Sequence, residues 1–233
     1  MIIAIDGPAG SGKSTTARWV AKTLGLLYLD TGAMYRAIAW AVLRDGVDPD
    51  EAGLADWLAH VRIEVHPHPE TMQVLVDGKD VTSLIRTPEV SGMASKVGTI
   101  PEVRTRLVDL QREIAHEQVR QKGGVVLDGR DIGTVVFPHA DLKIFLDADA
   151  RTRAERRVNE LVARGVSSDF DSVLAEIEAR DWQDRNRKHA PLRQAEDAHV
   201  LDTSHRTIAD QVHVVVNLAT QILQKNQARQ IQV

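Results

Sequence analysis

The stretch "IDGPAGSGKST", residues 5–15, decides the fold of this 233-residue chain. Its residues 7–14 match the pattern G-x-x-x-x-G-K-[ST], and an apolar run at residues 2–6 precedes them. From Lys13 onward, apolar side chains recur at helical spacing. A strand that passes through a glycine-rich turn into a helix is the setting in which this pattern binds phosphate. The stretch therefore predicts a P-loop that binds ATP or GTP.

Each residue type in this loop has a chemical reason to be there. Glycines let the backbone wrap a phosphate group, and the N–H groups at the helix start supply partial positive charge. Lys13 would reach the terminal phosphates, and Ser14 would be a ligand of the nucleotide's Mg²⁺. The alternative is a glycine-rich turn that binds nothing, but such a turn does not account for lysine and serine at these two positions.

The rest of the chain alternates predicted strands with predicted helices. Continuous apolar runs, typical of parallel strands covered on both faces, lie at residues 2–6, 26–30, 125–129, 142–148 and 199–203. Helical patterns lie at residues 13–24, 33–44, 101–121, 151–164 and 172–187. This alternation predicts an α/β fold with a parallel sheet flanked by helices. Residues 62–85 instead alternate apolar with polar side chains around a tight-turn signal, Asp77-Gly78, which predicts a small antiparallel β insertion.

Composition excludes several classes of protein. With 43% hydrophobic residues, 27% charged residues and a net charge of −4, the chain is an ordinary soluble one without the basic excess of a nucleic-acid-binding protein. The absence of cysteine rules out disulfides and thiolate metal sites. The apolar run at residues 37–43 is far shorter than the roughly 20 residues that a membrane span requires. We expect a cytoplasmic protein with no nucleic-acid or membrane partner.

A P-loop alone does not reveal how the phosphate is used. A guanine-specific switch would carry an N-K-x-D element, which the sequence lacks. A kinase that acts on a phosphorylated small molecule needs a second anion site opposite the P-loop, because both substrates carry phosphate charge. Three charged stretches could supply it, namely "LDTGAMYRA" at residues 29–37, "RTRAERRVNELVAR" at 151–164 and "ARDWQDRNR" at 179–187.

The first stretch is a strand end that turns into a helix. Thr31 is the expected N-cap, which would leave Tyr35 and Arg36 near the carboxyl edge of the sheet, where ligands bind in open α/β folds. A capped helix with a surface arginine is the alternative. Residues 151–164 hold five arginines against two glutamates and could close over a triphosphate, although arginines that only aid solubility would look the same.

In the third stretch, Arg180, Asp184 and Arg187 have the spacing i, i+4, i+7 and so share one helical face. Two arginines with a single carboxylate leave hydrogen-bond donors free for a phosphate. A salt-bridged solvent face is the alternative. The stretch "GGVVLDGRDIGTVVFP", residues 123–138, adds Asp128, Arg130 and Asp131 at the end of a predicted buried strand, where ions are costly without partners.

Six stretches together resemble the bacterial cytidylate kinases, from residue 5 to at least residue 202: "IDGPAGSGKST", "LDTGAMYRA", "IRTPEVSGMASKVGTIPEVR", "VVLDGRDIGTVVFP", "KIFLDA" and "RDWQDRNRKHAPL". The resemblance implies transfer of the γ-phosphoryl group of ATP, with Mg²⁺ bound, to CMP or dCMP in pyrimidine nucleotide metabolism. It also implies one adenylate-kinase-like domain with a P-loop core (residues 1–30, 99–150 and 190–225), a nucleoside-monophosphate-binding region (31–98, with the β insertion near 62–86) and a helical lid (151–189). We expect a monomer.

The same resemblance implies the site residues. The ATP phosphates would be bound by Gly7, Pro8, Ala9, Gly10, Ser11, Gly12, Lys13, Ser14 and Thr15. The CMP phosphate would be held by Arg36, Arg130 and Arg187, and the sugar by Arg180 and Asp184. The cytosine pocket would be formed by Ser95, Arg104 and Asp131, with Thr31 and Tyr35 in its wall. The chemistry of phosphoryl transfer adds two further expectations. Lys13, Arg153, Arg157, Arg180 and Arg187 would neutralise transition-state charge, and Ser14 of the P-loop and Asp128 at the neighbouring strand end would face the metal.

This assignment is chemically reasonable. A carboxylate such as that of Asp131 can accept a hydrogen bond from the cytosine N4 amine, whereas uracil presents a carbonyl oxygen that it would repel. No general base is needed, because the acceptor phosphate is already an anion. The alternatives are a P-loop kinase of another small acceptor and a nucleotide-dependent switch whose hydrolysis responds to a macromolecule.

Overall fold

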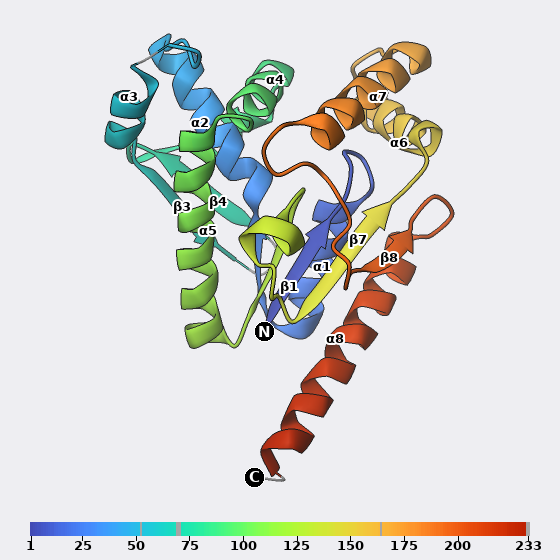
Figure 1. The fold of residues 1–233 in the computed structure, drawn as a ribbon. Helices are drawn as coiled ribbons and strands as arrows, with labels where there is room; N and C mark the ends of the chain where they lie inside the picture. Colours follow the sequence, from blue (N-terminus) through green and yellow to red (C-terminus); the bar gives the residue numbers. More distant parts are fainter. Residues whose placement is uncertain (52, 69–70, 164, 232–233) are drawn as a thin grey trace.

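The computed structural model describes residues 1–51, 53–68, 71–163 and 165–231. Its central element is a parallel sheet in the order β2-β6-β1-β7-β8 (Figure 1). The strands are β1 (Ile2–Asp6), β2 (Leu27–Asp30), β6 (Val125–Gly129), β7 (Leu142–Asp147) and β8 (His199–Asp202). Each lies within one residue of an apolar run predicted as a strand, so the predicted α/β fold is confirmed.

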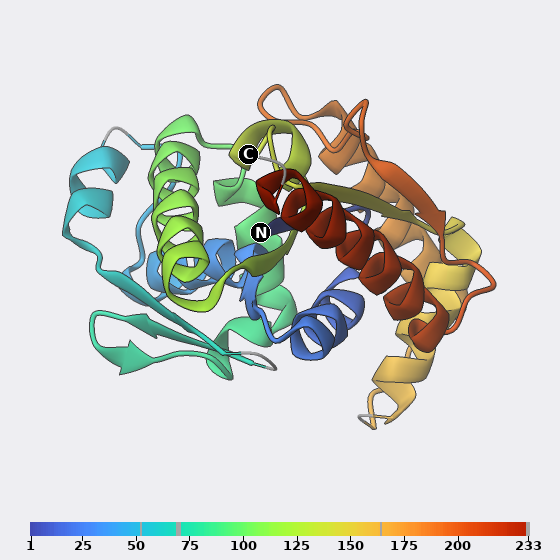
Figure 2. The same cartoon turned by 90° about the horizontal axis from the view of Figure 1, so that it is seen from below.

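Helices cover both faces of this sheet. Because successive side chains of a strand point to opposite faces, Ile3 and Ile5 of β1 pack in one core, and Ala4 packs in the other. Figure 2 shows α1 and α8 together on one side of the sheet. These helices are α1 (Lys13–Leu24) and α8 (Ile208–Ile231), and the opposite core contains α2 (Thr31–Asp45) and α5 (Pro101–Lys122). No helix in the described ranges is long and apolar enough to cross a membrane.

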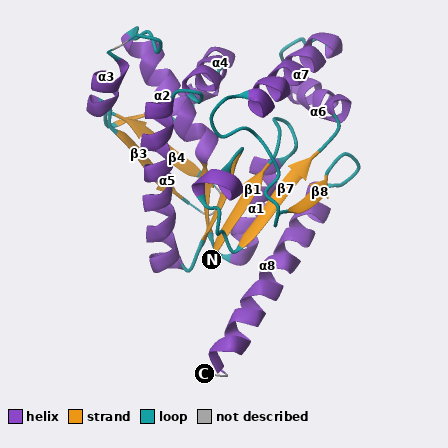
Figure 3. Ribbon diagram, viewed as in Figure 1, coloured by secondary structure: helices purple, strands orange, loops and turns teal. Residues whose placement is uncertain are grey.

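The β insertion is also confirmed. The strands β3 (Ile63–Pro67), β4 (Met72–Val76) and β5 (Lys79–Asp80) form an antiparallel sheet that lies beside the central one (Figure 3). The turn between β4 and β5 gives both Asp77 and Gly78 a positive φ, of 51° and 78°. Such angles favour the Asp-Gly pair that the sequence places there. Residues 69–70 of the predicted insertion lie outside the described residues.

Further helices stand above the carboxyl ends of the central strands (Figure 1). On one side α4 (Pro88–Val97) packs against α2, with η1 (Leu84–Arg86) and α3 (Leu54–His60) nearby. On the other side α6 (Ala150–Ala163) and α7 (Phe170–Asn186) pack on each other through a small apolar core of their own. Arg164, the last residue of the predicted helix at 151–164, lies outside the described residues.

The expected N-cap of α2 was wrong. The cap is Asp30, whose carboxylate accepts a hydrogen bond of 2.8 Å from the backbone N–H of Ala33. Thr31 is already helical, and its hydroxyl donates instead to the backbone carbonyl of Asp128 at 2.7 Å. Asp169 likewise caps α7, which therefore begins at Phe170, earlier than predicted. In each case an aspartate directly before the helix satisfies one of its first N–H groups.

Candidate active site

A cavity of about 820 Å³ opens at the carboxyl edge of the sheet, between the α2 and α4 side and the α7 side. Most of the predicted site residues line it: Ala9, Gly10, Lys13, Ser14, Thr31, Tyr35, Arg36, Ser95, Arg104, Asp128, Arg130, Asp131, Arg157, Arg180, Asp184 and Arg187. Residues predicted from six separate stretches of the sequence are thus brought together. Six other predicted residues are not among the described residues that line this cavity: Gly7, Pro8, Ser11, Gly12, Thr15 and Arg153.

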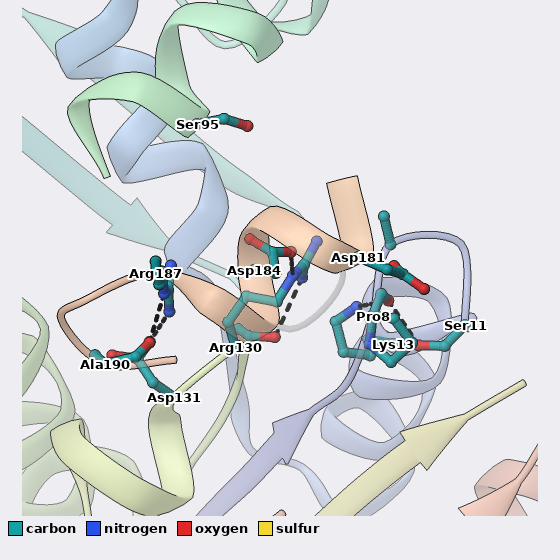
Figure 4. Close-up of polar contacts among 12 residues, drawn as sticks. Pro8, Ser11, Lys13, Ser95, Arg130, Asp131, Asp181, Asp184, Arg187 and Ala190 are labelled. Carbon is teal, nitrogen blue, oxygen red and sulfur yellow. Dashed lines mark hydrogen bonds and ion pairs between the residues drawn. The ribbon is translucent and has the colours of Figure 1, made fainter. Parts of the chain in front are cut away.

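The P-loop has the tight backbone that its glycines allow. Gly7 has a φ of 151°, and a Cβ there would lie 2.0 Å from the carbonyl oxygen of Leu146, so only glycine fits. Two hydrogen bonds within the loop join its ends. Lys13 Nζ donates to the Pro8 carbonyl at 2.6 Å, and Ser11 Oγ donates to the same oxygen at 3.1 Å (Figure 4). Burial, together with repulsion from Arg130, lowers the pKa of Lys13 well below its usual value. A phosphate beside this ammonium group would favour its charged form.

Asp128 lies next to the loop and has two hydroxyl partners. Ser14 Oγ donates to one carboxylate oxygen at 2.7 Å, and the Tyr28 hydroxyl donates to the other at 2.8 Å. Burial raises the pKa of Asp128, and the neighbouring carboxylate of Asp30 raises it further, whereas Lys13 lowers it. Tyr28 was not predicted as a site residue, because the sequence shows it only as part of an apolar strand.

These groups fit the predicted magnesium ion. Mg²⁺ prefers hard oxygen donors, and it is usually bound through one or two carboxylates together with substrate phosphates and water. The Ser14 hydroxyl and the Asp128 carboxylate are such donors and lie within 2.7 Å of each other. Among the described residues no three His, Cys, Asp or Glu side chains form a group that could hold a metal by themselves. The ion would therefore depend on the nucleotide for much of its coordination.

The base-reading carboxylate predicted at Asp131 is buried and paired. Arg104 donates to one of its oxygens. Arg187 Nη2 lies 3.8 Å from the other oxygen (Figure 4). The Arg104 guanidinium also lies 5.9 Å from the ring centre of Tyr35. Burial raises the pKa of Tyr35 to about 12, so the phenol stays neutral. Ser95 lines the same cavity from α4 and donates weakly to the Ser91 carbonyl at 3.4 Å.

Several arginines converge on the space between these two sites. Arg130 Nε donates to Asp184 at 2.8 Å, and Arg36 Nη2 donates to Asp30 at 2.9 Å. Burial lowers the pKa of Arg180, and the nearby Arg130 adds to this effect. Among the described arginines that line this cavity, three buried guanidinium nitrogens have no hydrogen-bond partner: Arg36 Nε, Arg180 Nε and Arg187 Nη2. Buried cations with unused donors are a natural site for an anion such as phosphate.

The two arginines predicted to lie in a lid differ in their surroundings. Arg157 lines the cavity and donates to Glu160 at 2.9 Å. Arg153 is buried, and its guanidinium forms a bidentate pair with Asp181 at 3.0 and 2.6 Å. It also donates to the carbonyls of Ala9 and Ala148, at 3.1 and 2.9 Å, and lines a second cavity of about 810 Å³. In this structure Arg153 therefore ties α6 and α7 to the P-loop, and the sequence did not indicate its partner.

Comparisons with known proteins show which family the chain resembles. A family model described as cytidylate kinase matches residues 3–221. A cytidylate kinase of Salinibacter ruber is 50% identical over 217 residues, which are 93% of this chain and 96% of that protein. One of Mycobacterium avium is 47% identical over 222 residues, 95% of this chain and 96% of that protein.

Among solved structures, an uncharacterized protein from Eubacterium ventriosum has a similar fold. Its TM-score is 0.50 at 11% identity, and the match covers 94% of this chain and 97% of that one. A likeness at this level of identity concerns the fold alone. The matches in sequence extend over nearly the whole chain and include both the P-loop and the arginine-rich cavity. The chain belongs to the cytidylate kinase family.

Proposed function

We propose that this protein transfers the γ-phosphoryl group of ATP to CMP or dCMP, and that the two substrates meet in the cavity of about 820 Å³. One observation carries the proposal. The P-loop and its lysine lie on one side of the cavity, and buried guanidinium nitrogens without hydrogen-bond partners among the described residues lie on the other. Two anion sites that face each other suit a reaction between two phosphate-bearing molecules.

The acceptor phosphate would be bound by Arg36, Arg130 and Arg187. The unused donors of Arg36 and Arg187 support this role, because a phosphate can accept from several of them at once. Arg180 and Asp184, both on α7, would bind the sugar. The hydrogen bond from Arg130 to Asp184 would keep the phosphate-binding and sugar-binding side chains aligned with each other.

The base would be read by Asp131, with Arg104 and Ser95. Arg104 occupies one oxygen of Asp131, which leaves the other oxygen able to accept from the cytosine N4 amine. Thr31 and Tyr35 would form the pocket wall. A uracil would instead bring a carbonyl oxygen toward the carboxylate, and the resulting repulsion would favour cytosine.

The phosphates of ATP would be bound by the P-loop, residues 7–15. Ser14 and Asp128 would hold Mg²⁺, which would neutralise charge on the nucleotide's phosphates. Lys13, Arg157 and Arg180 would stabilise the charge of the phosphoryl group during transfer, and Arg187 would keep the acceptor in line. Arg153 would assist by fixing the P-loop against the lid. No residue has to remove a proton, because the acceptor oxygen is already ionised.

We further propose the domain division of the family resemblance. Residues 151–189 would be a lid, residues 31–98 would close over the acceptor, and the remainder would be the core. The separate small core of α6 and α7 supports movement of these helices as a unit. Because one chain supplies both anion sites, a cytoplasmic monomer would be sufficient for activity.

An assay of ADP release over a panel of acceptors tests the function. CMP and dCMP should support turnover, and kcat/KM for UMP and AMP should be lower by about a hundredfold or more. Asp131→Asn should raise the KM for CMP far more than that for ATP. The matched control is Asp109→Asn, at an exposed position on α5, which should change neither.

Two results would contradict the proposal. One is turnover of UMP or AMP that equals turnover of CMP. The other is a rate of ATP hydrolysis that is unchanged by CMP and changes when a macromolecule is added.

A further inference from the structure

Asp6, the last residue of β1, is a buried carboxylate for which the proposed mechanism has no role. Its two oxygens accept hydrogen bonds from the backbone N–H groups of Ile132, at 2.9 Å, and Gly133, at 2.7 Å. These are the two residues directly after Asp131. The strand that leads into the P-loop therefore holds the turn that carries the base-reading carboxylate.

This turn depends on an outside acceptor. Asp131 has φ −146° and ψ 23°, and a π-helical turn, η2 (Ile132–Val136), begins after it. Its side chain makes no capping hydrogen bond, because it is directed to Arg104. The first N–H groups of a helical turn need acceptors from elsewhere when they are buried, and Asp6 is the acceptor for both.

Asp6 also holds the start of the segment that carries Arg130 and Asp131. The backbone of Asp6 pairs in register with Gly129 of the neighbouring strand β6, while its side chain binds the residues beyond Asp131. The surroundings are tightly packed, since a Cβ on Gly133 would lie 3.1 Å from Lys143 Cδ and 3.4 Å from Asp6 Oδ2. Arg130 and Asp131 are thus fixed at both ends by one residue.

We propose that Asp6 is a positioning residue that sets the orientation of Asp131 and thereby the preference for cytosine over uracil. The proposal rests on the role assigned above to Asp131. Asp6 is not among the described residues that line the cavity; it acts by holding the backbone from which the two acceptor-binding side chains project. Loss of one of its hydrogen bonds would let Asp131 move relative to the base, whereas the backbone pairing of Asp6 with Gly129, which holds the start of the P-loop, would remain.

The test compares Asp6→Asn with a matched control. Asparagine keeps the size of the side chain but can accept only one of the two bonds. The control is Asp141→Asn, because the Asp141 carboxylate also accepts a backbone N–H of β1, that of Ile2 at 2.6 Å, at the end of the strand away from the cavity. For Asp6→Asn we expect the ratio of kcat/KM for CMP to that for UMP to fall about tenfold, with the KM for ATP nearly unchanged. Asp141→Asn should leave all of these unchanged.

A second variant keeps the test decisive if Asp6→Asn does not fold. Gly133→Ala crowds the same turn, because its methyl group would lie 3.1 Å from Lys143 Cδ and in contact with Asp6 Oδ2, and it should also lower the CMP-to-UMP ratio. The proposal is overturned if a folded variant of either kind retains the wild-type ratio, or if the KM for ATP rises by the same factor as the KM for CMP. A wild-type protein that does not prefer CMP would instead refute the proposed function itself.

Discussion

The hydroxyl group of Tyr28 helps to fix the orientation of the Asp128 carboxylate. It donates to Asp128, whose other oxygen receives the Ser14 hydroxyl, so the proposed metal-facing carboxylate is fixed from two sides. Groups that orient the surroundings of a metal in this way strongly affect its affinity. The carboxylate would be less well oriented without the phenol.

We expect Tyr28→Phe to fold normally and to raise the Mg²⁺ concentration needed for half-maximal activity by about tenfold. The KM for CMP, measured at saturating Mg²⁺, serves as the internal control, because the Tyr28 hydroxyl bonds to Asp128 and not to Asp131. Titration of Mg²⁺ at fixed ATP gives the result. An unchanged requirement for Mg²⁺ would mean that Tyr28 only packs in the sheet.

At the scale of the element, the pair of α6 and α7 is held to the P-loop by Arg153. Its partner Asp181 is buried, and replacement by asparagine would leave a buried guanidinium without its counter-charge. We expect Asp181→Asn to lower the free energy of unfolding by about 3 kcal/mol. Glu160→Gln, which breaks the exposed pair with Arg157, should cost less than about 1 kcal/mol. Urea denaturation compares the two, and equal losses would show that the buried pair is no more important than the surface one.

Elements were predicted well from the sequence where local pattern determines them. The five central strands and the helix after the P-loop follow from apolar runs and from the glycine motif. The start of α2 was predicted wrongly, because Asp30 and Thr31 are both good N-cap residues. The choice depends on the contact of Thr31 with the Asp128 carbonyl, 97 residues away. A local pattern contains no information about such a contact.

The same reason explains which site residues were missed. Asp131 and the predicted arginines stand out in the sequence as charges, and all of them except Arg153 line the cavity. Asp6 and Tyr28 lie within apolar runs, and their partners are 126 and 100 residues away. Their roles depend on strand order and register, which only the folded sheet supplies.

For the molecule as a whole, Asp6 should make stability depend on pH. Burial raises its pKa from 3.8 to about 6, and Asp131 adds to this, while two N–H bonds and Lys13 act in the opposite direction. Between these values the folded protein holds a proton that the unfolded chain has lost. This contribution to stability is therefore complete below about pH 4 and is lost as the pH rises through about 6.

Relative to Asp6→Asn, the free energy of unfolding of the wild type should fall by about 1 kcal/mol between pH 5 and pH 7. Urea denaturation of both proteins at several pH values measures this difference. The use of the mutant as reference removes the effect of the other titrating groups. A difference that stays constant with pH would show that Asp6 has an ordinary pKa in the folded protein.

The central claim is that one cavity binds ATP and CMP at the same time, with the P-loop on one side and the arginines on the other. A compound in which adenosine and cytidine are joined by a polyphosphate chain tests it most directly. Steady-state inhibition by this compound should be competitive with ATP and also competitive with CMP. Inhibition that is competitive with ATP alone would contradict the claim, because the acceptor would then bind elsewhere.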